Sequence, residues 1–339
     1  MNNAYDESAA DRPPLSDSTL ARTPETGLDA PQGVPAETVP AAEQPAPAAD
    51  GAAPPSPRPL PGTSRRVLVM GIVNRTRDSF FDEGRTWGLQ AAVEAGIAAA
   101  ADGADLVDVG GVKFAPGEAL PVAEEIDRVV PVVRALRREL PARVLLSVDT
   151  FHAAVARAAV EVGADLINDT TGLSDPRMAP TVASAGASLV ITHSLAEPRR
   201  PYPSPRYDDV VAEVRGFLAA RLERALEAGI PRDRIVLDPG PDLNKSTVQT
   251  LEVLRGWQEY AALGMPLLAA LSRKDFVGES LGLPKDERLE GSLAAAAWTV
   301  QHGARILRVH DVAATVRMVR MLEVLAGWRE PAGPLVHNV

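Results

Sequence analysis

Eight short apolar runs with the composition of buried β-strands recur along the chain, separated by helical patterns. Strands alternating with helices predict parallel βαβ units, and eight such units predict an α/β fold of the closed (β/α)8 TIM-barrel type. Such barrels place their chemistry at the carboxyl ends of the strands. Seven of the eight runs are followed by polar side chains, so we expect those residues to line the rim of a site. The expected strands lie at about 67–73, 105–109, 144–148, 165–168, 188–192, 235–238, 267–271 and 305–309.

The segments between these runs carry helical patterns. In 120–140, apolar side chains recur at spacings of four, three, four, three and four residues, which places them on one helix face. The segments 206–229 and 291–303 are also expected to be helices. Three of the expected strands follow a helix end with a glycine that we predict to have a positive φ. These sequences are DGAD (102–105), VGAD (162–165) and HGAR (302–305).

Residues 1–62 differ in composition from the rest of the chain. They contain 13 prolines and one aromatic residue, with 9 acidic and 3 basic side chains. Such a segment buries too little apolar surface to offset the entropy lost on ordering, so we predict a disordered tail. Residues 63–329 match the roughly 250 residues of one barrel and predict a single domain. We expect 330–339 to be a flexible C-terminus.

Charge and composition exclude several classes of protein. The net charge is −10, and neither the tail nor the barrel segment has the basic excess of a nucleic-acid binder. No apolar stretch approaches the roughly 20 residues of a membrane span, and there is no basic start followed by an apolar run. The absence of cysteine excludes thiol catalysis, disulfides and thiolate metal sites. We therefore expect a cytoplasmic protein that contacts neither nucleic acid nor membrane.

Two carboxylates and an amide follow three of the central runs. Asp149, Asn168 and Asp238 come at the ends of the third, fourth and sixth runs. Burying a carboxylate there costs free energy unless it is paired or binds a ligand. Each alone could instead cap a neighbouring helix, as Asp149 before Thr150 could do. Together the three groups suit the donors and acceptors of a flat, nitrogen-rich heterocycle.

Basic side chains follow the last two runs. Arg308 and His310 end the eighth run, and a helix is expected to begin at Asp311 or just after it. A helix N-terminus beside an arginine and a histidine can bind an anion, and barrels often bind phosphate after strands 7 and 8. The alternative is a buried Arg308 paired with Asp311. Lys274, after the seventh run, either contacts a ligand or is an exposed lysine.

Two further features have no assigned chemistry. His193 ends the fifth run, where a core or supporting role is as compatible with the sequence as catalysis. The segment 239–247, PGPDLNKST, lacks the spacing of a phosphate-binding glycine loop. No pair of His and Glu residues has helical metal-binding spacing, so we expect no structural metal.

In order along the chain, these strand ends resemble those of the dihydropteroate synthase family, over essentially the whole expected barrel. That family joins p-aminobenzoate to a pterin-methyl pyrophosphate and releases pyrophosphate with Mg²⁺. The segments that carry the resemblance are MGIVNRTRDSF (70–80), DVGG (108–111), SVDT (147–150), INDTTG (167–172), DPG (238–240), LSRKDFVG (271–278) and RVHDV (308–312).

The resemblance implies a role for each matching residue. It implies that Lys274 and Asp149 are catalytic and that the pyrophosphate releases a pterin-methyl cation, which the amine then attacks. It also implies Mg²⁺ as cofactor, reached from Asn74 through the pyrophosphate, and a homodimer. The residues matching the pterin site are Asp149, Asn168, Asp238 and Lys274, and those matching the pyrophosphate site are Asn74, Arg308 and His310.

The sequence departs from the family pattern around the second substrate. Where the family usually reads GGESTRPG, this chain reads GGVKFAPG (110–117), so Phe114 and Ala115 replace the usual Thr and Arg. Alanine cannot replace the planar, five-donor cation of arginine. Asp275 replaces a serine and would repel a carboxylate substrate. The remaining departures are Val112 and Lys113, Arg75 and Arg77 after the first strand, and DLNK (242–245) in place of GFGK.

These departures favour a protein that keeps the pterin-pyrophosphate site but has weak or no synthase activity. The pattern resembles the divergent second dihydropteroate synthase copy of some bacteria, which is regarded as inactive. A working synthase, a transferase that uses another amine, and a non-catalytic pterin sensor or partner subunit remain as alternatives. A corrinoid methyltransferase-type pterin barrel fits less well, because Arg308 and His310 imply a pyrophosphate that its substrate lacks.

Overall fold

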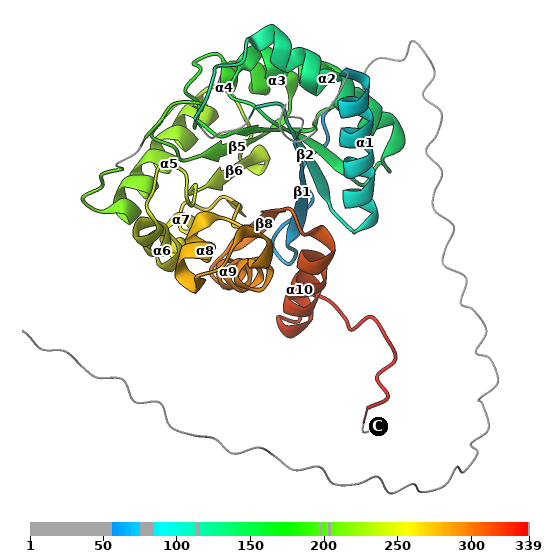
Figure 1. Cartoon of the computed structure of the whole chain (residues 1–339), viewed down its shortest axis with the longest axis vertical. Helices are drawn as coiled ribbons and strands as arrows, with labels where there is room; N and C mark the ends of the chain where they lie inside the picture. Colours follow the sequence, from blue (N-terminus) through cyan, green and yellow to red (C-terminus); the bar gives the residue numbers. More distant parts are fainter. Residues whose placement is uncertain (1–55, 75–84, 113–115, 197, 203–204, 338–339) are drawn as a thin grey trace, which may run out of the picture. The chain divides into compact units, whose positions relative to one another are not determined.

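The computed structural model describes residues 56–74, 85–112, 116–196, 198–202 and 205–337. Eight parallel strands close into a barrel in the order β1 to β8, and helices surround it (Figure 1). The (β/α)8 prediction is therefore confirmed. The strands are β1 (Leu68–Asn74), β2 (Leu106–Gly110), β3 (Leu145–Asp149), β4 (Leu166–Asp169), β5 (Ser188–Thr192), β6 (Ile235–Asp238), β7 (Leu267–Ala269) and β8 (Ala304–Val309).

Helices follow each strand and form the outer layer. The expected helix over 120–140 is confirmed as α2, and the glycines of the three recurring sequences have positive φ, at 99°, 109° and 114°. The helices are α1 (Arg85–Ala101), α2 (Val122–Glu139), α3 (Ala153–Glu161), α4 (Met178–Ala185), α5 (Val210–Glu227), α6 (Thr247–Arg255), α7 (Trp257–Ala261), α8 (Asp275–Leu281), α9 (Leu289–Gln301) and α10 (Val312–Leu325), with 3-10 turns η1 (Arg232–Arg234) and η2 (Lys285–Glu287).

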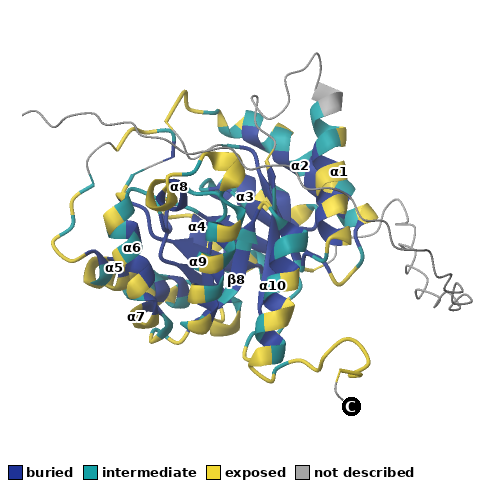
Figure 2. Cartoon of the chain, turned by 60° about the horizontal axis from the view of Figure 1, so that its bottom comes forward, coloured by how far each residue is buried: buried dark blue, intermediate teal, exposed yellow. Residues whose placement is uncertain are grey.

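Two apolar layers hold the barrel together, one inside it and one between strands and helices. Side chains alternate between the two faces of a strand, so Leu68 and Met70 point inward while Val67 and Val69 pack against helices. Figure 2 shows the strands buried and the exposed residues on the outer faces of the helices. The inner layer consists of Leu68, Met70, Leu106, Leu145, Leu166, Val190, Val236, Leu268 and Ile306.

The last residues of the predicted tail contact the barrel. The backbone N–H and the guanidinium of Arg58 donate hydrogen bonds to the buried Asp165, at 2.7–3.0 Å. Leu60 packs against the inner apolar layer. A single arginine that meets a distant carboxylate leaves no periodic pattern, so composition alone placed 56–62 in the tail. The predicted disorder of residues 1–55 lies outside the described part of the chain.

The C-terminal segment and the lengths of the helices bear on two further expectations. Residues 330–337 follow α10, are exposed, and belong to no helix or strand. Among the described helices, none combines the length and apolar character needed to cross a membrane.

Candidate functional site

A polar layer lies above the inner apolar layer, toward the carboxyl ends of the strands. The β-strand period of two that points the leucines inward also points the next inward residues into this layer. Asp149 pairs in register with both Gly110 and Asn168, and Thr192 pairs with Asp238. Register therefore brings together groups that are far apart in the sequence.

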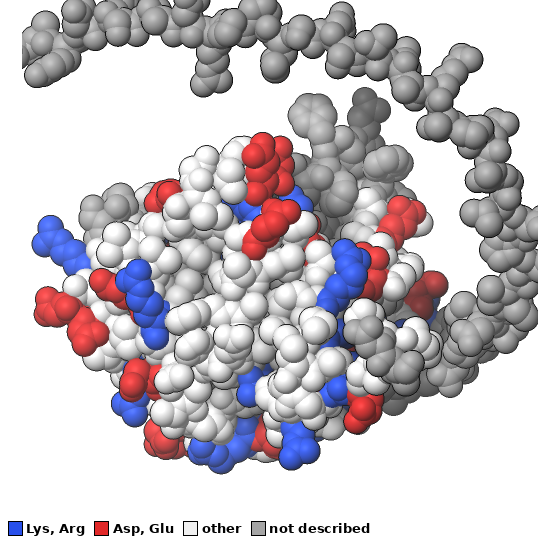
Figure 3. Space-filling model, turned by 90° about the horizontal axis from the view of Figure 1, so that it is seen from below, with Lys and Arg blue, Asp and Glu red and all other residues white. Residues whose placement is uncertain are grey.

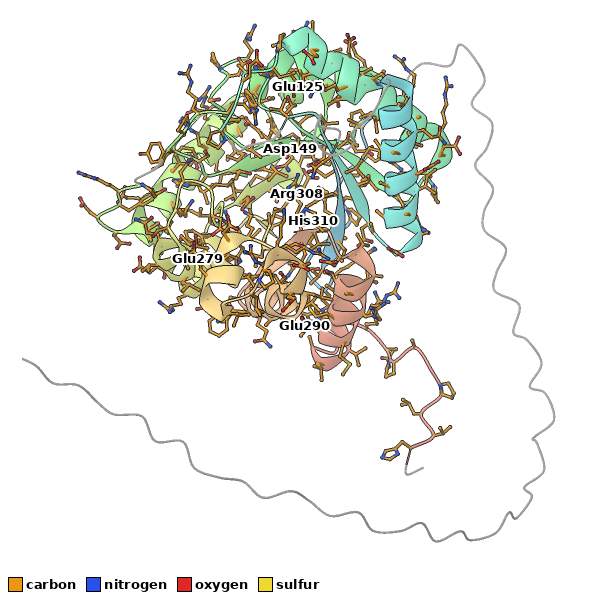
Figure 4. The ribbon with its side chains drawn as sticks, in the orientation of Figure 1. Glu125, Asp149, Glu279, Glu290, Arg308 and His310 are labelled. Carbon is orange, nitrogen blue, oxygen red and sulfur yellow. The ribbon has the colours of Figure 1, made fainter. Side chains whose placement is uncertain are left out.

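Arg308 lies at the centre of this layer. Its Nε donates to Asp108 Oδ2 at 2.7 Å, and its Nη2 donates to Asp149 Oδ2 at 2.8 Å. Figure 4 shows Asp149, Arg308 and His310 close together in the middle of the barrel, with Glu125 beyond Asp149. Burial opposes the charge of Arg308, but the two carboxylates prevail and raise its pKa.

The protonation of Asp149 is sensitive to pH near neutrality. Burial raises the pKa of Asp149 to about 7, and the neighbouring charge of Arg308 acts in the opposite direction. Asp108 and Glu125 add like-charge repulsion. A carboxyl that holds a proton near neutral pH can donate a hydrogen bond as well as accept one.

Asn168 presents an unused acceptor to this layer. Its Nδ2 donates to Asp108 Oδ2 at 3.2 Å, and Ser147 Oγ donates to the other oxygen of Asp108. Within the described structure, Asn168 Oδ1 is buried and has no hydrogen-bond partner. A buried acceptor without a partner costs about 1–3 kcal/mol, so a ligand N–H at this position would recover that free energy.

Asp238 and Lys274 form the opposite side of the layer. Burial raises the pKa of Asp238 and lowers that of Lys274, while the charge of each partly offsets the shift of the other. Lys274 Nζ donates to the carbonyl oxygen of Pro241 at 2.5 Å. The carboxylate of Asp238 is buried and the ammonium of Lys274 is half-buried, and Lys274 also lines the cavity described next.

A cavity of about 270 Å³ opens beside this layer. Desolvation at its wall, followed by the charge of Arg308, lowers the pKa of His310 to about 4. The imidazole is therefore neutral at pH 7, and its Nδ1 lies 3.2 Å from Ser272 Oγ. The positive charges around the cavity suit an anion. Its lining residues are Ile72, Asp242, Ala270, Ser272, Arg273, Lys274, Asp275, Lys285, Arg308 and His310.

Asn74 and Gly110 complete the rim. Asn74 is exposed at the end of β1 and pairs in register with Gly110. A Cβ on Gly110 would lie 3.6 Å from Asn74 Oδ1 and 3.6 Å from Asp149 Cβ. Gly110, at the one expected strand end without a polar side chain, therefore lies between the side chains of Asn74 and Asp149.

All seven predicted site residues thus lie at the carboxyl ends of the strands, and the alternatives for two of them do not hold. Arg308 does not pair with Asp311, because Arg273 forms that ion pair, with Nε 2.8 Å from Asp311 Oδ2. Asp149 does not cap α3, the helix that follows it, since α3 begins after His152 without a side-chain cap.

The sequence did not identify two carboxylates of this site, Asp108 and Glu125. Asp108 joins Arg308, Asn168 and Ser147, and its signal was a carboxylate at an inward position of an apolar strand. Glu125 is fully buried and accepts from Thr150 Oγ1 at 2.6 Å. It occupies the first turn of an amphipathic helix, where a carboxylate commonly lies at the surface, so no sequence pattern marked it.

The departures from the family pattern are only partly within the described structure. Asp275 is exposed and accepts from Arg288 Nη1 at 2.9 Å, which offsets its charge. Val112 is half-buried. The departures at Arg75 and Arg77, and at 113–115, lie outside the described residues.

Comparison with known proteins gives consistent matches. The family model described as "Pterin binding enzyme" matches residues 70–310. Inactive dihydropteroate synthase 2 of Mycobacterium tuberculosis H37Rv is 47% identical over 279 residues, covering 81% of this chain and 87% of the relative. Dihydropteroate synthase of Escherichia coli K12 is 38% identical over 77% of this chain and 93% of its own. The structure of the Xanthomonas albilineans dihydropteroate synthase with 4-aminobenzoic acid has a TM-score of 0.71 and 42% identity, covering 79% of this chain and 94% of that one.

Proposed function

Because the chain belongs to the pterin-binding enzyme family, we propose that it binds a pterin pyrophosphate at the carboxyl end of the barrel, with weak or no dihydropteroate synthase activity. The observation that carries the binding proposal is the buried Asn168 Oδ1 without a partner, in a layer that also holds Asp149, Asp238 and Lys274. These four groups supply both donors and acceptors to a flat heterocycle. The matching relatives support the pterin as that heterocycle.

The pyrophosphate would occupy the cavity beside Arg308 and His310. Arg308 offers a guanidinium, and the neutral His310 offers a ring N–H. Mg²⁺ commonly binds through one or two protein oxygens together with substrate phosphates, and the exposed amide of Asn74 fits that limited role. Within the described residues, no cluster of three or more His, Asp or Glu side chains is arranged to hold a metal, so the pyrophosphate would supply most of the ligands.

In the proposed chemistry, the bond between the pterin methylene and the pyrophosphate oxygen breaks, and the oxygen keeps the electron pair. Arg308 and Lys274 would stabilise the charge that develops on the leaving group, which is often the largest contribution to catalysis. Asp149, in its carboxylate form, would stabilise the cation left on the pterin. An amine would then attack that carbon, and its nitrogen would lose a proton to solvent or to the released pyrophosphate.

Weak activity with p-aminobenzoate is supported by residues on the second-substrate side. After Lys274 this chain has Asp275 where the family pattern has a serine, and Arg288 offsets part of the charge of that carboxylate. The sequence at 114–115 lacks the arginine of the family pattern. Two close relatives, from Mycobacterium tuberculosis and Mycobacterium leprae, carry the name inactive dihydropteroate synthase 2, at 47% and 46% identity.

A working synthase is the second candidate. It is favoured by the complete set of polar groups on β3, β4, β6 and β8, and by 38% identity to the Escherichia coli synthase.

Two further candidates share the same pterin site and differ only in the step after binding. One is a transferase that uses another amine, and the other is a non-catalytic sensor. Measuring pyrophosphate release from pterin pyrophosphate in the presence of Mg²⁺ separates these candidates. We expect little release with p-aminobenzoate, and release at a normal synthase rate would establish the second candidate.

We also propose that the chain forms a homodimer. Trp298 on α9 and Met321 and Leu325 on α10 are 46%, 54% and 71% exposed. Figure 3 views the side that carries α9 and α10 in Figure 1 and shows a largely uncharged area among scattered Lys, Arg, Asp and Glu. Light scattering should give twice the mass of 35.8 kDa, and Met321→Glu should shift it toward the monomer. A monomeric wild-type protein would contradict the dimer.

A further inference from the structure

A buried lysine outside the proposed ligand contacts lies at the end of the loop that follows β6. Lys245 is 7% exposed, and burial lowers its pKa to about 7. Its Nζ donates to Gly240 O at 2.9 Å, to Leu243 O at 3.1 Å and to His193 Nδ1 at 2.9 Å. An ammonium group has three N–H donors, so these three acceptors use all of them.

The loop 239–245 has a backbone shape that needs such support. Gly240, Asp242 and Asn244 all have positive φ, at 64°, 62° and 51°. A Cβ on Gly240 would lie 2.2 Å from the carbonyl oxygen of His193, so the loop lies directly on the end of β5. For Asp242 and Asn244 this conformation costs some free energy, although less than for most other side chains, and the contacts around the loop help to hold it.

Both Asp238 and Lys274 are hydrogen-bonded to this loop. Gly240 N–H donates to Asp238 Oδ1 at 2.8 Å, and Lys274 Nζ donates to Pro241 O. The carbonyl of Gly240 is also an acceptor of Lys245. The orientation of Asp238 and Lys274, two residues proposed to bind the pterin, therefore depends on the position of one loop. Lys245 connects this loop to the end of β5 by its hydrogen bond to His193.

We propose that Lys245 is a positioning residue for the pterin site. Through Gly240 and Leu243 it fixes the loop 239–245, and through that loop it fixes the carboxylate of Asp238 and the ammonium of Lys274. His193, whose role the sequence left open, acts as the third acceptor and joins the loop to β5. The effect of Lys245 on ligand affinity rests on the proposed pterin binding. Its effect on the conformation of the loop 239–245 can be tested without a ligand.

The ligand-free test follows the amide of Gly240. Labelling proline with ¹³C at the carbonyl and glycine with ¹⁵N selects the Pro–Gly peptides, which occur at 61–62, 116–117 and 239–240. In Lys245→Met, the Gly240 signal should move while the other two signals stay in place. In Lys245→Arg, which keeps a cationic donor, it should return toward its wild-type position. An unmoved Gly240 signal in Lys245→Met would overturn the proposal.

The binding test compares two ligands by calorimetry. Lys245→Met should bind pterin pyrophosphate roughly 10- to 100-fold more weakly, the range produced by loss of outer-shell hydrogen bonds at metal sites. Its affinity for inorganic pyrophosphate should fall less, because Arg308 and His310 make no hydrogen bond to this loop in the described structure, whereas Lys274, which also lines that cavity, does. Lys245→Arg should recover most of the pterin affinity.

Each outcome separates this inference from the proposed function. Wild-type protein that binds the pterin compound, with equal affinity in Lys245→Met, would overturn the positioning role alone. Wild-type protein that binds no pterin compound would overturn the proposed function and the functional part of this inference together. If Lys245→Met does not fold, Lys245→Gln, which keeps an amide donor, takes its place in both tests and is judged by the same outcomes.

Discussion

At the scale of single residues, Arg308 is the group on which the charges of the site depend. It is 17% exposed and forms ion pairs with Asp108 and Asp149, whose side chains are 0% and 18% exposed. A buried carboxylate left without its cation is strongly destabilising. The same ion pairs show how a side chain proposed for ligand binding also supports the fold.

Replacing Arg308 with methionine should therefore reduce the free energy of unfolding by about 3–5 kcal/mol at pH 7. Urea denaturation measures this change. The matched double variant, Arg308→Met with Asp108→Asn, should recover part of the loss, because it removes one of the two carboxylates left without their cation. A single variant as stable as the wild type would contradict the assigned ion pairs.

His193 makes a pH-dependent contribution to stability with a definite sign. Burial, followed by the charge of Lys245, lowers the pKa of His193 to about 3 from an ordinary value near 6.5. Between these values the unfolded chain binds a proton that the folded chain does not. The contribution of His193 to the free energy of unfolding is therefore fully present above about pH 6.5 and is lost as the pH falls toward 3.

His193→Gln should remove that dependence. Over this pH window the wild-type free energy of unfolding should fall by up to about 1.4 kcal/mol per pH unit more steeply than that of the variant. The glutamine oxygen can still accept from Lys245, so stability at pH 7 should change less than the slope does. Parallel stability curves for the two proteins between pH 4 and 6.5 would refute this assignment.

At the scale of elements, the positions of the strands were predictable and the contacts of the loops were not. Short apolar runs predicted all eight strands to within two residues at each end, because burial on both faces requires apolar side chains. Glycine after a helix marked three re-entries into the sheet. The loop after β6 carried no comparable pattern, because its shape depends on Lys245 and Asn244 meeting β5 and the residues after it.

The segment before β1 is a second case of a contact that local pattern cannot reveal. Arg58→Ala should reduce the free energy of unfolding by about 1–3 kcal/mol, because the buried Asp165 loses a charged donor but keeps Leu146 N–H at 2.9 Å. Arg65→Ala, at an exposed position nearby, is the matched control and should have little effect. Equal stabilities for the two variants would show that residues 56–62 do not support the barrel.

At the scale of the whole molecule, closure of the barrel turns a list of strand ends into a site. Asp149, Asn168, Asp238 and Arg308 are distant in the sequence, and only the order β1 to β8 places them around one layer. The fold and the location of these groups followed from pattern and resemblance. Asp108 was marked only as a carboxylate within an apolar strand, because its partners Arg308 and Asn168 lie on other strands and are set by the register of the barrel.

We claim that the site keeps its pterin-pyrophosphate half, and calorimetry of the wild-type chain with pterin pyrophosphate and Mg²⁺ is the sharpest test. We predict saturable binding that weakens about 10- to 100-fold in Asn168→Leu, which lacks the buried acceptor but keeps a similar side-chain volume. Equal affinity in the wild type and Asn168→Leu would contradict the proposed pterin contacts. Absence of binding by a folded wild-type protein would contradict the claim itself.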